Sequence, residues 1–160
     1  MKPTKVSAPI IPFAPASSWI QPSPLGASLI VAPWNFPFYL SIVPLIGVIS
    51  AGCCAVLKPS ELAPHSAQVI KKIVEEYMDQ DAIRVVIGDA TVGSSVLSLR
   101  WDKVCVAGGK KVGKIVAKAT AENFTSVTLE LGEKCPVIVD RDMNIPVCVS
   151  RALWVKVKHV

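Results

Sequence analysis

Charged residues are missing from a long N-terminal part of this sequence: no Asp, Glu, Lys or Arg occurs between Val6 and Leu57. The apolar stretch inside it, residues 36–57, is long enough to cross a bilayer. Pro37 and Pro44 interrupt this stretch, and a broken helix in lipid leaves backbone groups unsatisfied. A membrane-inserted protein is therefore the less favoured alternative to a soluble one, and sedimentation with lipid after a carbonate wash would separate the two.

Metal-ligand spacing and a leader peptide are missing as well. Neither of the two histidines stands at paired spacing with any of the five cysteines, so we expect no metal site. The five cysteines are odd in number and lie mostly in apolar runs, which is typical of reduced core cysteines in an intracellular protein. No apolar block with a small-residue cleavage pattern follows Lys2 and Lys5. We therefore expect a cytoplasmic location, with membrane association left open.

A nucleic-acid partner is not favoured either. The net charge is +5, and Lys110, Lys114 and Lys118 recur at the spacing of a solvated helix face. No interleaved aromatic residues accompany these lysines, so a platform for stacking bases is absent. We expect no binding of nucleic acid.

Apolar surface is what the sequence has in excess. Hydrophobic residues make up 51% of the 160 residues and charged residues 18%, an apolar balance for a single free-standing domain. We therefore expect one domain whose composition resembles a piece of a larger body. Association of the isolated chain through exposed apolar surface is expected, chiefly from residues 36–56 and 152–157.

Proline and periodicity divide the chain into three parts. Prolines at 3, 9, 12, 15 and 22 exclude a helix or an interior strand from residues 1–22, which we interpret as a Pro-rich extended tail. In residues 23–140 strands alternate with helices, which predicts an α/β fold with a doubly wound, mostly parallel, Rossmann-like sheet. Residues 141–160 form the third part. The expected strands are Ala27–Ala32, Cys54–Lys58, Ile83–Ile87, Lys103–Val106, Val127–Leu131 and Val137–Val139, and the expected helices are Leu40–Ser50, Pro64–Asp79, Val92–Leu99 and Lys110–Ala121.

Polar signatures fall at the carboxyl ends of these strands, where an open α/β sheet binds its ligands. Asn35 follows the first expected strand, and Lys58 and Glu61 follow the second. Gly108 follows a later strand, and Glu130 lies at the end of its own. We therefore expect one ligand site along this edge.

These signatures resemble the NAD(P)-dependent aldehyde dehydrogenases, and the Lys-Pro-Ser-Glu form is most similar to the class 3, fatty-aldehyde branch. The resemblance rests on several motifs that occur in one order. The motifs are Pro24-Leu25-Gly26, Trp34-Asn35-Phe36-Pro37, Ala51-Gly52, Lys58-Pro59-Ser60-Glu61, Val112-Gly113-Lys114-Ile115-Val116 and Val127-Thr128-Leu129-Glu130-Leu131-Gly132.

The resemblance implies oxidation of an aldehyde to a carboxylic acid, with hydride transfer to NAD and with NADP as the alternative acceptor. It implies that Asn35 points its amide at the aldehyde oxygen and stabilises the oxyanion, a contribution of about 3 to 4 kcal/mol in enzymes of this kind. A turn asparagine before a proline is the alternative for Asn35. Glu130 matches the general base that activates water to release the acyl group.

The same resemblance assigns the cofactor contacts. Lys58 and Glu61 match residues that contact the adenosine ribose, and a carboxylate there favours NAD over NADP. The alternative for this pair is a helix start, with Ser60 as the cap. Gly108 and Gly113 bound the loop that brings a helix N-terminus to the pyrophosphate.

Two departures from the family pattern bear on activity. Glu133 replaces the second glycine of the Glu-Leu-Gly-Gly-Lys motif and adds bulk and a second negative charge. The nucleophilic cysteine of the family maps beyond Val160, which makes residues 141–160 an incomplete start of the catalytic domain. None of the five cysteines matches that nucleophile. We therefore expect a catalytically incompetent fragment, with a non-enzymatic nucleotide-binding or interaction fragment as the alternative.

Overall fold

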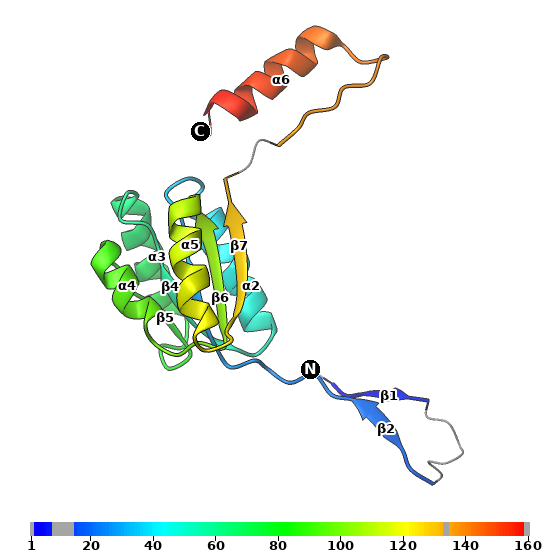
Figure 1. Ribbon diagram of the computed structural model, residues 1–160, viewed down its shortest axis with the longest axis vertical. Helices are drawn as coiled ribbons and strands as arrows, with labels where there is room; N and C mark the ends of the chain where they lie inside the picture. The colour runs from blue at the N-terminus through cyan, green and yellow to red at the C-terminus, as the bar shows by residue number, and fades with distance from the viewer. Residues whose placement is uncertain (1, 8–14, 133–134, 159–160) are drawn as a thin grey trace.

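A computed structural model describes residues 2–7, 15–132 and 135–158 (Figure 1). Its centre is a five-stranded parallel sheet in the order β5-β4-β3-β6-β7. The strands are β3 (Ala27–Val31), β4 (Cys54–Lys58), β5 (Ile83–Val85), β6 (Lys103–Gly108) and β7 (Ser126–Leu131), and the helices are α2 (Tyr39–Ser50), α3 (Pro64–Tyr77), α4 (Ala90–Leu97), α5 (Lys110–Ala121) and α6 (Ile145–Lys158). The expected α/β fold with a doubly wound parallel sheet is confirmed.

The strand order places the first strand of this sheet beside the fourth. β3 pairs with β4 on one side and with β6 on the other, in a register that sets Ser28 opposite Lys103 and Val31 opposite Val106. The chain therefore winds outward from β3 in one direction through β4 and β5, and then in the other direction through β6 and β7. Such a reversal opens a crevice at the carboxyl ends of β3 and β6, which is where sheets of this type bind their ligands.

Helices cover both faces of the sheet, because the central strands are apolar on both sides. On one face α2 and α3 bury a cluster that includes Ile30, Leu57 and Ile70. On the other face α4 and α5 cover a cluster that includes Leu29 and Val104. Neighbouring residues of β3 thus belong to opposite cores: Leu29 is 0% exposed and Ile30 is 1% exposed.

The C-terminal part differs from the expectation in one element. Residues 137–139, predicted as a strand, have no strand assignment, and Ile138 is 94% exposed. The prediction was wrong because an apolar run becomes a strand only when a neighbour completes its hydrogen-bond ladder, and no partner strand lies beside this segment in the described residues. Figure 1 shows this segment and α6 set apart from the sheet.

The described residues of the N-terminal part contain two strands. β1 (Thr4–Val6) pairs antiparallel with β2 (Ser18–Ile20), and this small sheet projects away from the main sheet (Figure 1). Pro3, Pro15 and Pro22 lie outside both strands, in keeping with the missing donor of proline. Residues 8–14 lie outside the described residues.

The uncharged stretch at 36–57 is divided between a helix and a strand. α2 takes up most of it, and a tight turn at Gly52, with φ of 70°, leads into β4. Within the described part of the chain, no helix is both long enough and apolar enough to span a membrane.

Candidate functional site

Lys58 and Glu61 lie together at the carboxyl end of β4. Lys58 is the last residue of this strand and is 5% exposed, while its Nζ donates a hydrogen bond to Glu61 Oε2 at 2.6 Å. This hydrogen bond and the adjacent positive charge hold the pKa of Glu61 below its ordinary value, because they stabilise the carboxylate. The Lys58 side chain is therefore buried, and the Glu61 carboxylate is partly exposed at the edge of the sheet.

The structure does not support a helix-capping role for this pair. α3 begins at Pro64 with Ala63 as its N-cap, so Glu61 precedes the helix. The Ser60 hydroxyl instead accepts a hydrogen bond from the backbone N–H of Leu62 at 3.2 Å, which closes a local turn. The segment 59–63 is thus a loop that holds Glu61 over the end of β4.

Two residues beside this pair were missed by the sequence reasoning. Asp89 caps α4 by accepting hydrogen bonds from Thr91 N at 2.9 Å and Val92 N at 3.2 Å, and its charge opposes the lowered pKa of Glu61. Gly93 lies against the Lys58 stem, since a Cβ there would meet Lys58 Cε at 3.7 Å. Asp89 before an apolar run is an N-cap signal, whereas the contact at Gly93 joins α4 to β4 and has no sequence signature.

The turn between β6 and α5 is open. Gly108 ends β6 and Gly109 is the N-cap of α5, and a Cβ built on either would meet nothing within 4 Å. No side chain in the described residues caps this helix end. The space beside both glycines is therefore open, and the exposed Lys110 and Lys111 begin the helix, whose first N–H groups have no intrahelical partner.

Gly113 has a packing role. A Cβ at this position would lie 2.6 Å from Leu131 Cδ2, so α5 approaches β7 at a distance that only glycine permits. The glycine is buried even though the helix around it is rich in lysine. The two glycines thus have different surroundings. Gly108 borders open space, whereas Gly113 allows α5 to pack closely against β7.

Asn35 and Glu130 lie at the same edge of the sheet, Asn35 after β3 and Glu130 near the end of β7. Asn35 is half-buried in the loop between β3 and α2. Glu130 is exposed near the end of β7. Its side chain lies on the face of the strand away from α5, where Ser126 and Thr128 are also exposed. Exposure explains how a carboxylate is tolerated at the end of this strand, so its presence there does not by itself require a catalytic role.

The cysteines are less uniformly buried than the sequence suggested. Cys53 is buried and Cys105 and Cys148 are half-buried, but Cys54 and Cys135 are exposed. Burial raises the pKa of the Cys105 thiol, which keeps it protonated and a poor nucleophile. No cluster of His, Cys, Asp and Glu in the described residues is suited to hold a metal ion.

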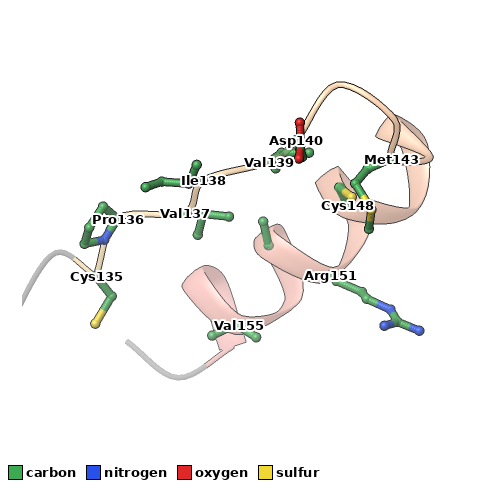
Figure 2. Close-up of a pocket in the computed structure, with 11 residues that line it drawn as sticks. Cys135, Pro136, Val137, Ile138, Val139, Asp140, Met143, Cys148, Arg151 and Val155 are labelled. Carbon is green, nitrogen blue, oxygen red and sulfur yellow. The ribbon is translucent and has the colours of Figure 1, made fainter.

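A hollow of about 560 Å³ lies between the extended segment at 135–140 and α6 (Figure 2). Cys135 stands at one end of the segment and Cys148 on the helix near the other, with Val137 and Val155 between (Figure 2). None of the site residues predicted from the sequence lines this hollow. It therefore belongs to a different part of the molecule from the sheet edge.

Comparison with known proteins identifies the family. The model of the aldehyde dehydrogenase family matches residues 3–159. The chain belongs to the aldehyde dehydrogenase family. Class 3 members are among its relatives: family 3 member H1 from Arabidopsis thaliana is 46% identical over 153 residues, which are 96% of this chain and 31% of that protein. The 4,4'-diaponeurosporen-aldehyde dehydrogenase of Staphylococcus aureus is 44% identical over 97% of this chain and 34% of its own length.

Solved structures agree with this assignment. A substrate-bound Staphylococcus aureus AldH superposes with a TM-score of 0.88 at 43% identity, covering 97% of this chain and 34% of that one. Betaine aldehyde dehydrogenase from the same organism, in complex with NAD+, gives a TM-score of 0.82 at 30% identity, over 94% of this chain and 30% of that one. The chain thus spans about a third of the length of these relatives.

Proposed function

We propose that this chain is the dinucleotide-binding part of an enzyme that oxidises an aldehyde to a carboxylic acid with NAD, NADP being the alternative acceptor. Family membership supports the reaction class. The observation that carries the proposal is the placement of the Lys58–Glu61 pair and of the open β6–α5 turn along one edge of the sheet, next to the crevice between β3 and β6.

The residues of this edge fit a dinucleotide. The uncapped N–H groups of α5 and the space beside Gly108 and Gly109 suit a pyrophosphate. Lys58 has donors for ribose hydroxyls, and the Glu61 carboxylate accepts from them and repels a 2'-phosphate. The dinucleotide supplies hydride acceptance, while this chain contributes its binding and orientation.

Asn35 and Glu130 are proposed as the groups that act on the aldehyde side. Their positions after β3 and near the end of β7 support this, because the carboxyl ends of parallel strands share one edge. Asn35 would donate its amide to the oxyanion, and Glu130 would take a proton from water. The exposure of Glu130 leaves its carboxylate accessible to water.

We further propose that the 160-residue chain on its own turns over no aldehyde. Covalent oxidation needs an activated thiolate at the site. Cys53 lies in the hydrophobic core and Cys105 has a raised pKa, while Cys135 and Cys148 line the hollow beside α6. These positions support the second candidate function, a nucleotide-binding fragment without activity of its own.

Calorimetric titration with NAD tests the binding proposal. We expect Lys58→Met, which keeps the buried stem, and Glu61→Ala to raise the Kd by about tenfold each, the equivalent of one charge-assisted hydrogen bond. Glu75→Ala is the matched control, because it removes an exposed ion pair to Lys71 on α3. Equal affinity in all four proteins would refute a role for the Lys58–Glu61 pair.

Activity is measured separately, as NADH formation from hexanal and from benzaldehyde. We expect no turnover by the isolated chain. A rate of order one per second or faster would overturn this part of the proposal, since it is typical of competent enzymes. Loss of such a rate in Cys135→Ser or Cys148→Ser would identify the thiol that carries it.

A further inference from the structure

A second carboxylate follows β5, the strand that lies next to β4 in the sheet. Val86 N donates to the carbonyl of Leu57 at 2.9 Å, so the chain leaves β5 at the same edge at which Lys58 ends β4. Asp89 then forms the N-cap of α4. This carboxylate therefore lies at the edge of the sheet that holds the Lys58–Glu61 pair.

Two contacts join Asp89 to the pair. Gly93 N donates to the carbonyl of Asp89 at 2.9 Å, which closes the first turn of α4. A Cβ on Gly93 would meet Lys58 Cε at 3.7 Å, so this turn packs against the lysine stem. The pKa of Glu61 is lowered chiefly by its hydrogen bond to Lys58 and is raised in part by the Asp89 charge. One ammonium and two carboxylates thus lie together.

The charge of Asp89 has no compensating cation. Glu61 accepts from the Lys58 ammonium at 2.6 Å, whereas no lysine or arginine of the described residues forms an ion pair with Asp89. Asp89 is exposed, and its Oδ1 accepts from Thr91 N at 2.9 Å and from Val92 N at 3.2 Å. The carboxylate is therefore a negative charge in a defined position, beside an ion pair that is neutral as a whole.

The same two hydrogen bonds occupy the N-terminus of α4. A phosphate beside a helix N-terminus is bound by N–H groups that have no intrahelical partner. At α4 the N–H groups of Thr91 and Val92 already donate to Asp89. A phosphate near the Lys58–Glu61 pair would therefore meet an additional negative charge, and the helix donors nearest to it are already bonded.

We propose that Asp89 is a second specificity-determining residue, which acts with Glu61 against a 2'-phosphate on the adenosine ribose and so favours NAD over NADP. The inference rests on the dinucleotide site proposed above and adds to it a residue that acts through its charge. A phosphate monoester carries between one and two negative charges near neutral pH. Each of the two carboxylates therefore weakens the binding of a 2'-phosphorylated dinucleotide relative to NAD.

The alternative role for Asp89 is that of a helix cap alone. Asparagine caps a helix about as well as aspartate, so a cap does not require the charge. Asp89→Asn keeps the oxygen that accepts from Thr91 and Val92 and removes the charge. Asp89→Gly removes both the charge and the side-chain acceptor, and glycine is itself tolerated at an N-cap. The two variants therefore separate the effect of the charge from that of the cap.

Calorimetric titration of the whole chain with NAD and with NADP measures the ratio of the NADP Kd to the NAD Kd. We expect Asp89→Asn to lower this ratio about fivefold, as for one partly screened charge. Asp89→Gly should lower it further, because two N–H groups of α4 become available to the phosphate. An unchanged ratio in Asp89→Asn would overturn the proposal.

Asp79→Asn is the matched control. Asp79 is also exposed, and it also accepts a hydrogen bond from a backbone N–H, that of Asp81 at 2.9 Å. It precedes β5 and therefore lies at the opposite end of this strand from Asp89. The control makes the same charge change and should leave the ratio of the two Kd values as it is in wild type. A fall in the control equal to that in Asp89→Asn would show that net charge alone is responsible and would refute the specific role of Asp89.

Ionic strength gives a second readout, which a helix cap would not move. Because Asp89 is exposed, salt should shrink the difference in the ratio between wild type and Asp89→Asn. At about 1 M salt, where the Debye length is about 3 Å, we expect the two proteins to differ by less than about twofold. A difference that does not depend on salt would contradict an effect of charge.

The same titrations distinguish this inference from the proposed dinucleotide site. Binding of NAD together with an unchanged ratio in Asp89→Asn refutes the role of Asp89 and leaves the dinucleotide site in place. If wild type binds neither dinucleotide, the proposed site itself is refuted, and the role of Asp89 is refuted with it.

Discussion

The β3–β4 half of the sheet and the β6–β7 half differ in how they are covered. β3 and β4 lie beneath helices on both sides, and their sequences, Ala-Ser-Leu-Ile-Val and Cys-Ala-Val-Leu-Lys, are nearly continuous in small and apolar residues. β7 reads Ser-Val-Thr-Leu-Glu-Leu and alternates between exposed and half-buried positions. Such alternation is typical of a strand with one wet face. Both halves present candidate site residues at one edge, but only the first half is covered by helices on two sides.

Truncation of one leucine in each half of the sheet should show the difference in coverage most clearly. Leu57 is 0% exposed between β4 and its helices, whereas Leu129 is half-buried beneath α5 alone. We expect Leu57→Ala to lower the free energy of unfolding by about 3 to 4 kcal/mol and Leu129→Ala by about 1 to 2 kcal/mol, because a larger cavity remains at the fully packed position. Urea unfolding at low protein concentration measures both. Equal losses would show that β7 is covered in solution as fully as β4.

Two glycine-to-alanine substitutions, one in a helix of each half, should change stability in opposite directions. Gly113→Ala forces a Cβ to within 2.6 Å of Leu131, and we expect a loss of about 1 kcal/mol after the gain in helix propensity is included. Gly47→Ala in α2 meets nothing within 4 Å and should gain about 0.5 to 1 kcal/mol. The double variant Gly113→Ala/Leu131→Ala relieves the clash. Thermal unfolding that shows the same sign for both single variants would contradict the close contact of α5 with β7.

The smallest expected effect is on the pH dependence of stability, through the Glu61 carboxylate that follows β4. The pKa of Glu61 is lowered by Lys58, so its contribution to stability is present above the ordinary value of 4.5 and is lost as pH falls through the lowered pKa. We expect wild type to lose more stability than Glu61→Gln over this acid range, by well under 1 kcal/mol because the carboxylate is 41% exposed. In a Lys58→Met background the same substitution should change the pH slope of unfolding less, because only the backbone hydrogen bond then lowers the pKa of Glu61. An undiminished difference in that background would assign the lowered pKa to another group.

Much of the fold was predictable, since its strands are short apolar runs between helices of clear period. The segments at 54–58 and 110–121 have the bounds predicted from the sequence, and other elements differ by a few residues at their ends. The segment at 137–139 has the composition of a strand and was predicted wrongly, because pairing depends on a neighbour that composition does not specify. The hairpin of β1 and β2 was missed for the converse reason: its pairing joins residues on either side of a Pro-rich segment.

The candidate site, like the fold, was predictable from the sequence only in part. That polar residues follow the strands and share one edge could be inferred from spacing, because parallel strands align their carboxyl ends. The assigned roles of Asn35 and Glu130 remain predictions. Glu133, which replaces the second glycine of the family motif, lies outside the described residues, so its expected effect on activity stays a prediction.

The sequence by itself determined the family and the alternation of strands and helices, because motifs and periodicity are local properties of the chain. The tertiary structure decided which half of the sheet is covered, that Lys58 pairs with Glu61, and that Gly113 allows α5 to approach β7. It also decided that Asp89 and Gly93 of α4 lie beside the Lys58–Glu61 pair. These relations depend on which strands become neighbours, and that choice is made by the packing of the whole chain rather than by any segment of it.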